Sequence, residues 1–124
     1  MDQYIESLRA LPLFEGATKR ELRQIAKLMT PFEVSAGTVL LEEGAPAEEA
    51  FVIIEGLVRI TRSDTVIAEL GQGDAVGEMA LLAGGSRVAS AVAASTVRGL
   101  MMNRREFLSF LEASPSVTLR IMSV

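Results

Sequence analysis

The residues best suited to chemistry lie in one short stretch, from Gly77 to Ser90, which reads GEMALLAGGSRVAS. Its first half, through Ala83, consists of good helix formers and predicts one or two helical turns that begin at Gly77. The first amide groups of such a turn have no partner within the helix and attract anions. The glycine-rich turn at residues 83–86 reverses the chain and is expected to bring Arg87 back beside that helix start.

The two charged side chains of this stretch indicate the kind of ligand. A planar guanidinium such as that of Arg87, placed beside free amides, suits a phosphate group. The carboxylate of Glu78 weakens a site for a polyanion but fits a ligand that also offers a sugar hydroxyl. The pair therefore favours a nucleotide with few phosphate charges. The alternative is that Glu78 and Arg87 form an exposed ion pair with each other, worth about 0–1 kcal/mol, beside an ordinary turn.

The same stretch resembles the phosphate-binding cassette of the cyclic-nucleotide-binding domain family. The matching positions are Gly77, Glu78, Ala80, Leu81, Leu82, Arg87, Ala89 and Ser90. The resemblance implies that Arg87 neutralises a cyclic phosphate and that the backbone near Ala80, Val88 and Ala89 binds the phosphate oxygens. It also implies that Gly77 and Glu78 bind the ribose, with Glu78 accepting the 2′-hydroxyl.

Three positions depart from the family pattern, and one of them bears on the base. Val76 replaces an aromatic residue, Ser86 replaces a proline, and Val88 follows the arginine. A threonine after the arginine is associated in the family with a preference for cGMP, through its hydroxyl. Valine has no hydroxyl, so the expected ligand is cAMP rather than cGMP.

By analogy with the family, the base lies against an apolar wall. The candidates are Val58, Ile60, Leu70, Met79, Val88 and Ser90. The strand residues among them fit a plain hydrophobic core better than a ligand contact. An apolar wall with few polar groups is nevertheless how small-ligand pockets are generally built.

Length and composition narrow the possible functions. A chain of 124 residues has room for one domain with a single core. The net charge of −4 and the scattered basic residues argue against a nucleic-acid surface. The chain has neither cysteine nor histidine, which removes disulfides, thiolate catalysis and the commonest metal ligand and general base. No apolar run is long enough for a membrane span, and we expect a cytoplasmic protein.

The rest of the sequence predicts a mainly β fold with flanking α-helices. A helix over Asp2–Ala10 and a second one capped by Thr18 and Glu21 precede the strands. Short β-branched runs follow between glycines, and their tight spacing predicts hairpins between successive strands, with the last two strands at Arg87–Ala94 and Thr96–Met102. These runs predict an eight-stranded antiparallel jelly-roll β-sandwich, interrupted by the cassette helix.

After the strands, Asn103 with Glu106 caps a C-terminal helix, and Ser114-Pro115 begins another with an apolar stripe at Val117, Ile121 and Val124. We therefore expect a single cyclic-nucleotide-binding domain over residues 1–124. Residues 1–30 form its N-terminal helices and residues 31–102 its β-roll, with the cassette at 76–90. Residues 103–124 form C-terminal helices that are too short for the family's complete lid.

The predicted function is a regulatory module that binds cAMP and couples binding to movement of its C-terminal helix. It would act on an effector domain or a partner protein as a monomer or weak dimer, and it would catalyse nothing. One alternative is a degenerate, ligand-free β-roll that serves as a protein-interaction or structural domain. A second, a metal enzyme on a similar barrel, is disfavoured because the chain has no histidine for the metal.

Overall fold

The computed structural model describes residues 2–10 and 14–115. The helices and strands follow one another as α1 (Asp2–Arg9), α2 (Lys19–Leu28), β1 (Thr30–Val34), β2 (Val39–Leu41), β3 (Glu49–Glu55), β4 (Val58–Arg62), β5 (Thr65–Leu70), β6 (Ala75–Val76), α3 (Glu78–Ala83), β7 (Ser90–Ala93), β8 (Val97–Asn103) and α4 (Arg104–Ala113). The expected apolar stripe at Val117, Ile121 and Val124 lies outside the described residues.

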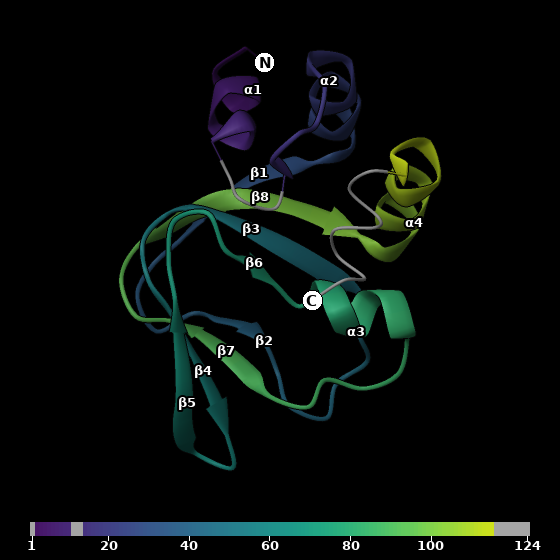
Figure 1. Cartoon of the computed structure of the whole chain (residues 1–124). Coiled ribbons are helices and arrows are strands. Elements are labelled where there is room, and N and C mark those ends of the chain that lie inside the picture. The colour runs from purple at the N-terminus through teal and green to yellow at the C-terminus, as the bar shows by residue number, and fades with distance from the viewer. Residues whose placement is uncertain (1, 11–13, 116–124) are drawn as a thin grey trace.

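The strands form two four-stranded sheets that pack into a sandwich. The first sheet has the order β1-β8-β3-β6 and the second the order β2-β7-β4-β5, and every recorded pair of strands is antiparallel. Helices α1, α2 and α4 cover the outer face of the first sheet, and α3 lies at one end of the sandwich (Figure 1). The predicted mainly β sandwich with flanking helices is confirmed.

Strand β3 divides the interior into two hydrophobic cores. Ala50 and Val52 point toward the helices, whereas Phe51 and Ile53 belong to the core between the two sheets. Because side chains alternate along a strand, a strand covered on both faces reads as an unbroken apolar run. This explains why the sequence from Ala50 to Ile54 shows no alternation of polar and apolar residues.

The two predicted helix caps are present. The hydroxyl of Thr18 accepts from the amide of Glu21 at 3.1 Å, and the Glu21 carboxylate accepts from the amide of Thr18 at 2.9 Å. Asn103 and Glu106 make the same reciprocal pair at 2.8 and 3.1 Å. Both caps satisfy amides that the first turn of a helix leaves without partners.

The expected pairing of successive strands is wrong for most of the sandwich. Among the described strands, β4 and β5 alone form a tight hairpin, through Ser63 and Asp64, whose φ values are +49° and +67°. The other successive strands alternate between the two sheets, so neighbours in the sequence face each other instead of sharing an edge. The strand expected over Arg87–Ala94 begins only at Ser90, and the two-residue strand β6 was not foreseen.

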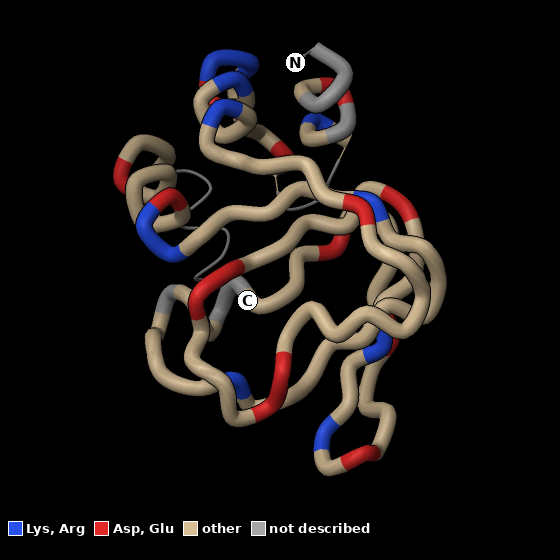
Figure 2. Tube along the Cα trace, turned by 180° about the vertical axis from the view of Figure 1, so that it is seen from behind, with Lys and Arg blue, Asp and Glu red and all other residues tan. Residues whose placement is uncertain are grey.

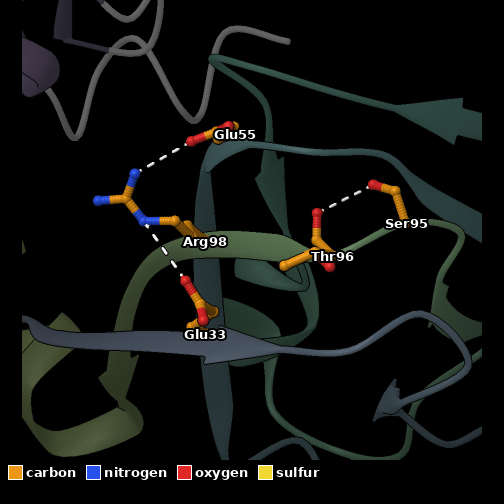
Figure 3. A network of polar contacts seen from close by, with 5 residues as sticks. All are labelled: Glu33, Glu55, Ser95, Thr96 and Arg98. Carbon is orange, nitrogen blue, oxygen red and sulfur yellow. Dashed lines mark hydrogen bonds and ion pairs between the residues drawn. The ribbon is translucent and has the colours of Figure 1, made fainter.

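Polar contacts on the first sheet are exposed. Arg98 on β8 lies between Glu33 on β1 and Glu55 on β3, at 3.8 and 3.0 Å (Figure 3). More than half of each side chain is open to solvent, so these ion pairs contribute about 0–1 kcal/mol each.

None of the helices within residues 2–10 and 14–115 combines the length and apolar character that a transmembrane span needs.

Candidate functional site

An open pocket of about 270 Å³ lies between α3 and the inner side of the second sheet. Most of the predicted site residues line it: Ile60, Leu70, Gly77, Ala80, Arg87, Val88, Ala89 and Ser90. They come from four segments that are separated in the sequence. The pocket is near the lower end of the roughly 300–1,000 Å³ that is usual for small-molecule sites.

Arg87 is the charged residue among the described residues that line the pocket, and the fold fixes its side chain. The residue is only 5% exposed. Its Nη1 donates to the carbonyl oxygen of Gly77 at 2.8 Å, and its Nη2 donates to the carbonyl oxygen of Glu49. The predicted return of Arg87 to the start of the cassette helix is therefore confirmed.

The backbone on either side of Arg87 is held by the loop between β2 and β3. The amide of Arg87 donates to the carbonyl of Ala45 at 2.8 Å, and its carbonyl accepts from the amide of Gly44 at 2.8 Å. Two residues earlier, the carbonyl of Gly85 accepts from the amide of Ala47 at 2.9 Å. The arginine therefore extends from a segment that is tied down before β7 begins.

Gly77 is required at the start of α3 for two reasons. Its φ of +84° lies in the left-handed region, where glycine is the favoured residue. A β-carbon at this position would also lie 2.7 Å from Nη1 of Arg87 and 3.0 Å from Cδ1 of Leu41. The glycine thus leaves the space that the guanidinium occupies.

Most of the residues that line the pocket are apolar. Ile60 on β4 and Leu70 on β5 line it as expected. The pocket also includes four residues that sequence reasoning did not assign to the site: Leu41, Ala75, Val76 and Ala91. No local signal in the sequence singles out Leu41, since β2 is apolar throughout, and its meeting with Ala91 depends on the pairing of β2 and β7 in the second sheet.

The remaining predicted residues are placed differently. Val58 is fully buried in the core between the sheets and is not among the residues that line the pocket. Val88 is 68% exposed and lies at the pocket's open side. The hydroxyl of Ser90 accepts from the amide of Glu43 at 2.9 Å. The side chains of Glu78 and Met79 lie outside what the structure describes.

The arrangement suits a small anionic ligand with an apolar part. A buried guanidinium binds a phosphate strongly, and aliphatic lining residues offer contact without hydrogen bonds to a planar base. Among the described residues, no three acidic side chains gather in a way that could hold a metal ion.

Comparison with known proteins identifies the family to which this fold belongs. The family model described as "Cyclic nucleotide-binding domain" matches residues 31–114, which include both sheets, the pocket and α4. The chain belongs to this family.

Relatives from three kinds of protein share the domain. The chain is 34% identical, over 87% of its length, to 30% of a cyclic nucleotide-gated potassium channel of Mesorhizobium japonicum. It is 25% identical, over 96% of its length, to 55% of a CRP-like cAMP-activated global transcriptional regulator of Mycobacterium tuberculosis. Among solved structures, the regulatory subunit of a cAMP-independent protein kinase A from Trypanosoma cruzi, bound to guanosine, is 31% identical with a TM-score of 0.86, covering 96% of this chain and 43% of that one.

The chain is thus similar to one part of each of these proteins, spanning 30% to 55% of their lengths. It is a cyclic-nucleotide-binding regulatory domain of the kind that such proteins carry.

Proposed function

We propose that the domain binds cAMP in preference to cGMP, with Arg87 receiving the cyclic phosphate. The observation that carries the proposal is Arg87, a residue only 5% exposed, among the mostly apolar residues that line the pocket. Taking a phosphate into such a surrounding is unfavourable unless a cation and hydrogen bonds compensate it. The ribose contact of Gly77 and Glu78, and the phosphate contacts of the backbone at Ala80, Val88 and Ala89, belong to the same proposal.

The preference for cAMP rests on Val88. Its side chain lies at the open side of the pocket and carries no hydrogen-bonding group. A guanine that approached this position would find no hydroxyl partner for its polar edge. The missing hydroxyl therefore weakens the binding of guanine more than that of adenine. The relatives' names point to more than one ligand, since one regulator is cAMP-activated and one kinase subunit was solved with guanosine.

Isothermal titration calorimetry tests the proposal. The purified chain is unfolded, refolded to remove carried-over ligand, and titrated with cAMP, cGMP and guanosine. We expect saturable one-to-one heat with cAMP and weaker binding of cGMP. Guanosine lacks the phosphate, so it should bind least well. Val88→Thr should shift the ratio of the two affinities toward cGMP by about tenfold, the effect of roughly one hydrogen bond.

Two outcomes would contradict this function. Absence of heat with all three ligands, from a protein shown to be folded, would favour a β-roll that has lost its ligand. Binding of guanosine as tight as that of cAMP would remove the role of Arg87 in phosphate recognition.

The proposal includes an output through α4. The amide of Arg104, the first residue of α4, donates to the carbonyl of Glu48 at 2.9 Å, one residue before the carbonyl that accepts from Arg87. The same helix packs against α3. A ligand that draws Arg87 and α3 into new contacts therefore acts directly on elements that hold α4, and a change in their positions shifts the population of α4 arrangements.

A further inference from the structure

Helix α2 carries a stripe of positive charge on its solvent face. Lys19, Arg20, Arg23 and Lys27 are all exposed, whereas Leu22, Ile25 and Ala26 of the same helix are buried. Lys19, Arg23 and Lys27 are four residues apart and extend about 12 Å along the helix. We call these four residues the basic stripe; Figure 2 shows that positive residues gather on this helix.

The stripe has no ion pairs within the described part of the chain, where all recorded ion pairs lie on the sheets. Glu21 is the one acidic residue of α2, and its carboxylate accepts from the amide of Thr18 in the helix cap. The basic residues of the sequence are therefore not simply scattered, because the fold brings four of them onto one helix face.

This arrangement is unfavourable for the helix itself. Like charges three and four residues apart repel each other, and Lys19 and Arg20 stand in the first turn, where the helix dipole disfavours cations. A local pattern that opposes stability without an evident structural gain is a sign of a binding surface. The charge pattern suggests a partner that is strongly negative.

The surface around the stripe indicates what kind of anion fits. The exposed large hydrophobic residues of the described chain are Val39, Leu57, Val66, Ile67, Val88 and Leu108, and none of them is on α1 or α2. Protein interfaces usually hold an apolar or aromatic centre that anchors the partner. A stripe of long basic side chains without such a centre is better matched to an extended anionic surface that is bound by charge alone.

We propose that the basic stripe of α2 binds the surface of a membrane that contains anionic lipid. Clusters of four or more basic residues on a helix are typical of such contacts. The stripe lies on the outer side of the helices that cover the first sheet, and the nucleotide pocket lies beside the second sheet (Figure 1). The domain can therefore contact a membrane while its pocket stays open to solvent.

Co-sedimentation with lipid vesicles tests this proposal. The full chain is mixed with phosphatidylcholine vesicles that either contain or lack phosphatidylserine, in about 10 mM salt, where charges act over about 30 Å. We expect binding to the anionic vesicles only, and its loss at about 0.15 M salt. The variant Arg20→Gln, Arg23→Gln, Lys27→Gln should bind about a hundredfold more weakly, at about fivefold per charge.

A variant with the same change in net charge is the control. Arg62→Gln, Arg104→Gln, Arg105→Gln removes three exposed charges outside α2 and should keep most of the binding. The stripe variant should also melt no lower than the parent, because it relieves repulsion. Equal losses in both variants, no binding of the parent, or tighter binding of the parent to duplex DNA than to the vesicles would each overturn the proposal.

Discussion

At the scale of single residues, the site depends on one arginine that the backbone holds. The guanidinium of Arg87 bonds to two carbonyl groups from different segments, those of Gly77 and Glu49. The side chain is therefore positioned before any ligand arrives. A group fixed in this way loses little conformational entropy when it binds a phosphate, and this increases affinity.

Arg87→Ala should weaken cAMP binding by about thirtyfold to several thousandfold, the effect of removing one partner of a buried charged pair. It should also reduce the free energy of unfolding by about 1–3 kcal/mol, because two carbonyl groups lose their donor. Calorimetry and chemical denaturation measure the two effects separately. Arg87→Lys keeps the charge but lacks the planar guanidinium, so its affinity for cAMP should lie between those of the parent and the alanine variant. Unchanged cAMP affinity in both variants would exclude the phosphate role.

Gly77→Ala should damage both the helix start and the arginine. The left-handed backbone costs alanine about 1–2 kcal/mol, and the added carbon would lie 2.7 Å from Nη1 of Arg87. We expect cAMP affinity to fall at least tenfold, by roughly the worth of one charged hydrogen bond. Calorimetry with cAMP measures the loss.

A matched control for this variant is Gly37→Ala. Gly37 has a φ of +92°, but no atom lies within 4 Å of the place that a β-carbon would take, so the variant tests backbone strain alone. Gly77→Ala should lose at least as much stability as Gly37→Ala, because it adds the close contacts with Arg87 and Leu41 to the backbone strain, and only Gly77→Ala should lose affinity. A similar loss of affinity in Gly37→Ala would show that general destabilisation, not displacement of Arg87, explains the result.

The sequence was sufficient to predict that Arg87 lies beside Gly77, because the helix start, the turn and the arginine lie within eleven residues of one another. Leu41 and Ala91 could not be predicted as neighbours, because they meet through a strand pairing with an irregular register. Val58 was a candidate by position in the family. It lies on the same face of β4 as Ile60, but two residues earlier in the strand, where it is buried in the core between the sheets. Contacts between residues close in the sequence could be predicted, whereas contacts that depend on the pairing of distant strands could not.

At the scale of elements, helix caps depend on residues close in the sequence, whereas strand pairing depends on distant ones. The caps at Thr18 and Asn103 involve residues three apart and were predictable from their spacing. The sheet order depends on contacts between distant strands such as β1 and β8. Among the described strands, the prediction that successive strands pair as hairpins was correct only for β4 and β5, where two turn residues with positive φ join the strands.

Thr18→Ala should reduce the free energy of unfolding by about 1 kcal/mol, because one amide at the start of α2 loses its acceptor. Thr18→Ser keeps the hydroxyl, so its free energy of unfolding should stay close to that of the parent. Since α2 covers the first sheet and the pocket lies at the second, the dissociation constant for cAMP should not change in either variant. Urea denaturation and calorimetry measure these quantities, and equal stability of all three proteins would show that the cap is not important.

At the scale of the whole molecule, the first sheet separates two cores with different roles. The core between the sheets supports the pocket through residues such as Ile60 and Leu70, which pack against it. The core under the helices joins α2 and α4 to Leu81 of α3 and to β3. Helix α3 thus belongs to the pocket through Ala80 and to the helical core through Leu81, which is fully buried.

This position of α3 predicts which amides respond to the ligand. When cAMP draws α3 and Arg87 toward the phosphate, the packing of Leu81 against the helical core has to adjust, so hydrogen exchange should change in α4 as well as in α3. Residues 50–53 of β3 should change little, because they are buried on both faces of the first sheet. Hydrogen exchange followed by mass spectrometry, with and without saturating cAMP, measures this directly. Arg87→Ala at the same cAMP concentration is the control and should show neither change. Protection confined to the pocket, with α4 unaffected at full occupancy, would mean that α4 does not carry the signal.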